Sequence, residues 1–121
     1  PNDQTSKHRE VKGTLPKMRL RAIKADIAAH RTRPDLSLDW IARRHCISGS
    51  YVRALFDQES TSFTDYLVTR RLSRVHRILS NPLYRDRPIS EIAIESGFNN
   101  LSWFYRAFKR RFEITPSDLR S

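Results

Sequence analysis

An internal repeat constrains the fold of this chain of 121 residues more than any other feature. The apolar positions of residues 38–56 recur in residues 89–108. In each copy a small residue stands four positions after a central alanine, Cys46 in the first and Gly97 in the second. The alanine lets two helices approach closely, and the apolar residues further along hold the second helix across the first. The repeat therefore predicts two helix-turn-helix units in tandem, with one extra residue between turn and second helix in the second copy.

The two turns differ in their central residue. Gly97 can adopt a positive φ without steric cost, whereas Cys46 lacks that freedom. Two alternatives follow for the first turn: it is built differently from the second, or it carries some backbone strain.

Local signals predict about seven helices and no strand. Apolar spacing, caps and prolines mark helices at about 16–30, 38–45, 49–58, 62–80, 88–96, 100–112 and from 116 onwards. We expect an all-α fold over residues 15–121, after a flexible lead-in or interdomain linker over residues 1–14. The helix-turn-helix units span about 37–58 and 88–112, and the long helix over about 62–80 joins them. The predicted core includes Trp40, Phe56, Leu72, Ile92, Phe98, Phe104, Phe108 and Phe112.

The charge balance favours a polyanionic partner. Lys and Arg number 23 against 13 Asp and Glu, which gives a formal net charge of +10. Each phosphate that such a chain neutralises releases a condensed counterion, which favours binding to nucleic acid. A well-solvated basic surface is the plainer alternative.

Other chemistry finds little support in the sequence. Cys46 is the single cysteine, so neither an intramolecular disulfide nor a cysteine-based zinc site is possible. His30, His45 and His76 lack the spacing of metal ligands, and we expect neither a metal nor a cofactor. No apolar stretch is long enough to span a membrane.

The second copy carries a recognisable motif. Its residues are Ser90-Glu91-Ile92-Ala93, Gly97-Phe98, Ser102 through Phe108, Phe112 and Thr115-Pro116. With them, the chain resembles the AraC/XylS family of bacterial transcription regulators over about residues 16–121. Three residues depart from the family pattern: Glu113 replaces a frequent glycine, Cys46 a commoner small residue, and Trp103 places a bulky aromatic beside the expected base contacts.

The resemblance implies sequence-specific binding of double-stranded DNA. Two recognition helices, at about 49–58 and 100–112, are expected to enter successive major grooves of a promoter site. It also implies an activator in the bacterial cytoplasm, associated with the nucleoid, that contacts RNA polymerase. Because the chain starts at Pro1 and its first 14 residues are polar, we expect a fragment that lacks its N-terminal sensor and dimerisation domain. We expect this fragment to be monomeric, since no apolar stripe is left over after the core is assigned.

Base contacts are expected from outward positions of the two recognition helices. An arginine fork matches O6 and N7 of guanine, which makes Arg53 the best candidate, and Arg106 is taken as its counterpart. A phosphate contact or an ion pair is the alternative for Arg53, and packing on a neighbouring helix is the alternative for Trp103. The full set of expected base contacts is Ser50, Arg53, Ala54, Ser102, Trp103 and Arg106.

Phosphate contacts are expected where basic or helix-capping residues flank the recognition helices. Arg70, Arg74 and Arg77 share one stripe of the long helix, which either follows the DNA backbone or pairs with acidic side chains. Asn99 or Asn100 is more typical of a helix cap than of an adenine contact. The expected phosphate contacts are Gly49, Arg70, Arg74, Asn99, Asn100, Lys109 and Arg110.

Two rival classes of function fit the sequence less well. An enzyme is disfavoured because the chain has no nucleophile elbow, phosphate-cradling glycine loop or zinc-protease motif. An RNA-binding or purely protein-binding helical module is the second rival. RNA binders expose stacking aromatics, whereas the aromatics here fall at inward positions of the repeat.

Overall fold

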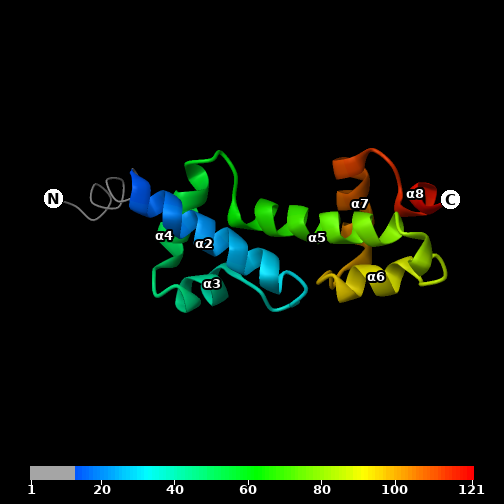
Figure 1. Ribbon diagram of the computed structural model, residues 1–121, viewed down its shortest axis with the longest axis horizontal. Helices are drawn as coiled ribbons and strands as arrows, with labels where there is room; N and C mark the ends of the chain where they lie inside the picture. The colour runs from blue at the N-terminus through cyan, green and yellow to red at the C-terminus, as the bar shows by residue number, and fades with distance from the viewer. Residues whose placement is uncertain (1–12) are drawn as a thin grey trace. The chain divides into compact units, whose positions relative to one another are not determined.

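A computed structural model describes residues 13–121, and all regular structure in that range is helical (Figure 1). The α-helices are α2 (Thr14–His30), α3 (Leu38–Arg44), α4 (Gly49–Asp57), α5 (Phe63–Leu79), α6 (Ile89–Glu95), α7 (Leu101–Phe112) and α8 (Pro116–Arg120), with a short 3-10 helix, η1 (Pro82–Tyr84), after α5. The predicted all-α fold is confirmed. Within the same range, no helix is long and apolar enough to cross a membrane.

Helix starts follow the local signals of the sequence. Side chains of Ser37, Ser48, Ser62, Asn100 and Thr115 each accept a hydrogen bond from the backbone N–H three residues later. Helix α6 begins after Pro88 without a side-chain cap, and α2 begins at Thr14, ahead of Pro16. Proline is tolerated there because N–H groups of a first helical turn have no intrahelical partner. Of the predicted lead-in over residues 1–14, the structure describes only Gly13 and Thr14. The rest of that prediction lies outside the described residues.

The chain forms two compact units. Of the described residues, the first contains 13–30 and Asp35–Leu67, and the second contains Arg31–Pro34 and Val68–Ser121. The long helix α5 contributes its first residues to one unit and the remainder to the other.

The core of the first unit lies among α2, α3, α4 and the start of α5. Helix α2 contacts both α3 and α4, and α3 contacts α4. Ile23 and Ile27 of α2, Ile41 of α3, and Val52 and Phe56 of α4 are fully buried. Of the predicted core, Trp40 is only partly buried and packs at the edge of this cluster.

The core of the second unit is built on aromatic rings. Phe98, Phe104, Phe108 and Phe112 follow one another with centroid separations of 5.0, 5.8 and 4.7 Å. Phe104 and Phe108 are fully buried, whereas Phe112 is partly buried near the end of α7. The predicted core residues Leu72 and Ile92 are buried here as well.

The two turns have the same construction. Cys46 has φ of 56° and Gly97 has φ of 108°, so both residues are left-handed. The amide after each turn residue donates to the carbonyl of the central alanine, Ile47 N to Ala42 O at 3.0 Å and Phe98 N to Ala93 O at 3.1 Å. Of the two alternatives for the first turn, the one with backbone strain therefore applies. Cys46 adopts a backbone conformation that suits glycine.

Gly97 meets a second requirement. A Cβ at this position would lie 2.5 Å from Arg71 Nε and 2.7 Å from the carbonyl oxygen of Arg31. Arg71 is 9% exposed, and it donates from Nε to Arg31 O at 2.7 Å and from Nη2 to Arg33 O at 2.6 Å. Glycine is thus needed for the turn and for the close passage of this arginine.

A cluster of side chains around the carboxylate of Asp26 joins α2 to α3. Arg44 Nε donates to Asp26 Oδ2 at 2.8 Å, His45 Nε2 lies 3.0 Å from that oxygen, and His30 Nδ1 lies 2.9 Å from Oδ1. The hydrogen bond from Arg44 is the main cause that holds the pKa of Asp26 below its ordinary value, against an opposing effect of burial. The Arg44 guanidinium also lies 4.8 Å from the centre of the Trp40 ring.

Candidate nucleic-acid interface

Helix α4 presents a polar side opposite its buried side. Ser48 caps it, and Tyr51, Val52, Leu55 and Phe56 are its buried residues. Ser50 and Arg53 are exposed, as the sequence predicted for base contacts. Gly49 and Ala54 are only partly exposed, and Ala54 packs against the core of the first unit. The reach of Ala54 towards a base is correspondingly short.

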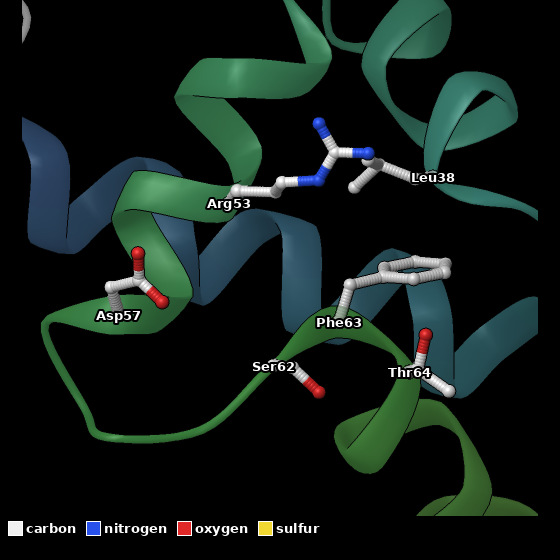
Figure 2. A pocket seen from close by; sticks show the side chains of 6 residues that line it. All are labelled: Leu38, Arg53, Asp57, Ser62, Phe63 and Thr64. Carbon is white, nitrogen blue, oxygen red and sulfur yellow. The ribbon is translucent and has the colours of Figure 1, made fainter.

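Arg53 lies over a hollow of about 270 Å³ in the first unit. Figure 2 shows its guanidinium extending from α4 towards Leu38, with the Phe63 ring at one side and Asp57 one turn further along α4. Within residues 13–121, Arg53 makes neither a hydrogen bond nor a salt bridge. The ion-pair alternative therefore has no support here, and the fork is available to an external acceptor.

Helix α7 is the second candidate recognition helix. The side chain of Asn100 accepts a hydrogen bond from Trp103 N at 2.9 Å. Of the two cap candidates in the sequence, Asn99 and Asn100, the cap is therefore Asn100. Asn99 is exposed beside it. The other predicted contact residues of this helix are all exposed: Ser102, Trp103, Arg106, Lys109 and Arg110.

Counting from the caps corrects one predicted correspondence. Ser50 and Ser102 both stand two positions after their caps, Ser48 and Asn100. The same count pairs Arg53 with Tyr105, and it pairs Ala54 with Arg106. Arg106 is therefore not the counterpart of Arg53, because Arg53 stands five positions after its cap and Arg106 stands six positions after its own.

Tyr105 is the contact candidate that sequence reasoning missed. It is 40% exposed, and its ring centre lies 5.2 Å from that of Phe104. Aligning the two helices from their caps, rather than by their arginines, would have found it.

Trp103 is both packed and accessible. Its ring centre lies 6.1 Å from that of Phe98, yet the residue is 40% exposed. Its counterpart Tyr51 is only 5% exposed. Trp103 thus packs in part on the turn residue Phe98, and its contact with DNA stays a prediction.

The basic residues of α5 differ in what they contact. Arg71 is buried and donates to the backbone carbonyls of Arg31 and Arg33. Burial lowers the pKa of its guanidinium. Arg74 is partly buried and donates from Nη1 to Ser96 Oγ at 2.6 Å. In the described part of the chain, the Nε of the partly buried Arg70 has no hydrogen-bond partner. Arg74 thus retains further N–H donors, whereas the unpartnered Nε of Arg70 is itself buried.

Between residues 13 and 121, no group of three or more His, Cys, Asp or Glu side chains is placed to hold a metal ion.

Known proteins are similar to this chain in sequence. A family model described as a helix-turn-helix domain matches residues 41–121. The transcriptional activator RhrA of Rhizobium meliloti is 32% identical over 105 residues, which are 87% of this chain and 33% of RhrA. The regulatory protein SoxS of Escherichia coli K12 is 33% identical over 70% of this chain and 78% of SoxS.

A solved structure agrees with the sequence matches. The C-terminal domain of AraT, a response regulator from Geobacillus stearothermophilus, superimposes with a TM-score of 0.74 at 25% identity, covering 84% of this chain and 82% of that one. The family match covers more than half of the chain, and SoxS is matched over more than two thirds of its own length. The chain belongs to the AraC/XylS-type helix-turn-helix family of transcription regulators.

Proposed function

We propose that this chain reads double-stranded DNA at a promoter by inserting α4 and α7 into successive major grooves. The observation that carries the proposal is the duplicated unit: the same left-handed turn, followed by a capped helix with an apolar inner side and exposed polar residues outside. A major groove admits one α-helix, and outward side chains then reach the base edges. The net charge of +10 supplies the attraction to the phosphate backbone.

Each recognition helix contributes its own readers. Arg53 and Arg106 reach guanine through their forks, and Ser50 and Ser102 contact bases or phosphates near the helix starts. Trp103 packs on sugars and thymine methyl groups with its exposed part. Phosphates are held by the partly exposed Gly49, Arg70 and Arg74 and by the exposed Asn99, Asn100, Lys109 and Arg110.

The regulatory role follows from the relatives. RhrA is a transcriptional activator, and we extend activation to this chain. The chain covers only 33% of the length of RhrA. Activation of transcription by this chain is therefore part of the proposal. Three further points stay predictions: contact with RNA polymerase, a further sensor and dimerisation domain, and a monomeric state of residues 1–121.

Selection of random duplex DNA by the purified chain tests the proposal. The expected motif has two short blocks about one helical turn apart. Arg53→Ala and Arg106→Ala each weaken binding by about 1–3 kcal/mol and relax the preference in one block only. Arg21→Ala, which removes an exposed arginine of α2, is the matched control and leaves both blocks intact.

Two results contradict the proposal. In one, no motif emerges, and both variants only flatten the salt dependence of binding, as a generic basic surface would. In the other, single-stranded RNA competes as well as the selected duplex, which would favour the RNA-binding alternative.

A further inference from the structure

A second basic hollow, of about 300 Å³, lies in the second unit. Residues of the last turns of α5, of η1 and of the segment before α6 line it: Arg74, Arg77, Ile78, Asn81, Tyr84 and Arg87. All but Ile78 carry a polar or ionisable group, and none belongs to the recognition helix α7. The hollow is therefore distinct from the predicted base-reading residues and large enough for a phosphate group.

Its three arginines are incompletely neutralised. Arg77 is exposed and, among residues 13–121, has neither a hydrogen-bond partner nor an ion pair. Arg74 uses one N–H on the hydroxyl of Ser96, which is a neutral group. Arg87 pairs with Glu95, whose pKa this hydrogen bond lowers. Three positive charges thus line the hollow, and one of them has a carboxylate in contact.

Repulsion among neighbouring arginines reveals the same excess of charge. Burial is the main cause that lowers the pKa of Arg31, and the positive charges of Arg70, Arg77 and Arg74 lower it further. The positive charges of these three arginines are therefore close enough to Arg31 to disfavour its charged form. An arrangement of this kind gains when an anion enters it, because the anion turns mutual repulsion into shared attraction.

Neutral donors complete the site. The side-chain oxygen of Asn81 accepts a hydrogen bond from Leu83 N at 3.0 Å, which leaves its amide nitrogen as a donor. Tyr84 adds a phenolic hydroxyl at the rim, where it is 40% exposed. Guanidinium forks pair two N–H groups with two oxygens of one phosphate, a geometry that a chloride ion cannot use.

We propose that this hollow is a phosphate-binding site, with Arg77 as its principal ligand and Arg74, Arg87, Asn81 and Tyr84 around it. Two sources supply that chemistry: a backbone phosphate of bound DNA, or a free phosphate compound. The site shares Arg74 with the phosphate contacts proposed above, but it does not depend on base reading by α4 and α7, so its phosphate binding without DNA stands or fails apart from base reading.

Titration of the whole 121-residue chain with inorganic phosphate, without DNA, tests the site. The readout is the arginine Nε–Hε signals in nitrogen-15 NMR spectra, with sodium chloride and sodium acetate at matched ionic strength as reference titrations. Phosphate is expected to shift a small set of these signals saturably, and Arg77→Gln to weaken its binding about tenfold, as loss of a charge-assisted fork implies. Arg85→Gln is the matched control, since Arg85 is exposed next to η1 but does not line the hollow.

DNA binding then distinguishes the two sources. If the phosphate comes from DNA, Arg77→Gln lowers the slope of log affinity against log salt by about one relative to Arg85→Gln, and inorganic phosphate competes with DNA. If it is a free compound, both variants bind DNA alike in phosphate-free buffer. The proposal is overturned if Arg77→Gln and Arg85→Gln have the same phosphate affinity, or if chloride or acetate reproduces the phosphate shifts.

Discussion

At the scale of single residues, the two turns solve one geometric problem with different side chains. Gly97 supplies the left-handed backbone without cost, whereas Cys46 adopts it with a Cβ in place. An L-residue other than glycine loses roughly 1–2 kcal/mol in this conformation. The first turn therefore holds strain that the second turn lacks.

Replacing Cys46 by glycine is expected to stabilise the chain by up to about 1 kcal/mol, because the relieved strain exceeds the added freedom of the unfolded chain. Urea unfolding in reducing buffer measures the change. Cys46→Ala keeps a Cβ and is the matched control, with no gain expected. Equal stability of the glycine and alanine variants would show that the turn is unstrained.

Replacing Gly97 by alanine is expected to destabilise the chain by more than about 2 kcal/mol. The new Cβ meets Arg71 Nε at 2.5 Å and Arg31 O at 2.7 Å, and φ is 108°. The control is Gly49→Ala in α4, where a Cβ finds its nearest contact, Leu38, at an ordinary 3.5 Å. The free energy of unfolding in urea decides, and a loss equal to that of Gly49→Ala would contradict the expectation.

At the scale of elements, local signals predicted most of the structure and long-range pairing escaped prediction. The bounds of α3, α4 and α7 follow from serine and asparagine caps that act three residues away. The partners of Arg71 lie 38 and 40 residues back in the chain, and the partners of Asp26 at the end of α3 and its C-cap lie 18 and 19 residues ahead. No periodicity of one helix encodes such contacts, so sequence reasoning predicted the outward positions of Arg53 and Arg106 but missed the anchoring of Arg71.

The link between α2 and α3 is expected to weaken in acid. Asp26 has a folded-state pKa below its ordinary value of 3.8. Its ionised form therefore stabilises the fold above that value, and the contribution is lost as the pH falls through the folded-state pKa. Thermal unfolding of the Asp26→Asn variant should begin at a lower temperature than wild type at pH 7.

The difference between Asp26→Asn and wild type should shrink steadily below about pH 4, because wild type then loses the same interaction. Asp86→Asn, which changes an exposed carboxyl outside the cluster, should leave the pH dependence of wild type intact. A difference that stays constant down to pH 2 would rule out Asp26 as a source of acid sensitivity.

At the scale of the whole molecule, the charge of +10 sets how strongly DNA binding depends on salt. The proposed phosphate contacts include four cationic residues: Arg70, Arg74, Lys109 and Arg110. Each neutralised phosphate contributes about 0.9 to the slope of log affinity against log salt, so a slope of about −3.6 or steeper is expected.

Removing one proposed phosphate contact should change that slope by about one. Lys109→Ala is expected to weaken binding to all duplex sequences alike and to flatten the slope accordingly. Lys17→Ala, on the exposed side of α2, removes the same charge from a position with no proposed contact and should leave the slope unchanged. Identical slopes for both variants would mean that only total charge matters.

The hydrogen bonds of Arg71 bear on how such a chain can be recombined. Its acceptors belong to Arg31–Pro34, which form part of the second unit although the residues on both sides belong to the first. The backbone therefore passes from one unit to the other three times, after His30, Pro34 and Leu67. A protein fragment that starts after Leu67 would contain Arg71 but would lack both of its acceptors, the backbone carbonyls of Arg31 and Arg33. The two halves of this duplicated protein are consequently not interchangeable cassettes, and a working chimera has to carry the four loop residues together with the second half.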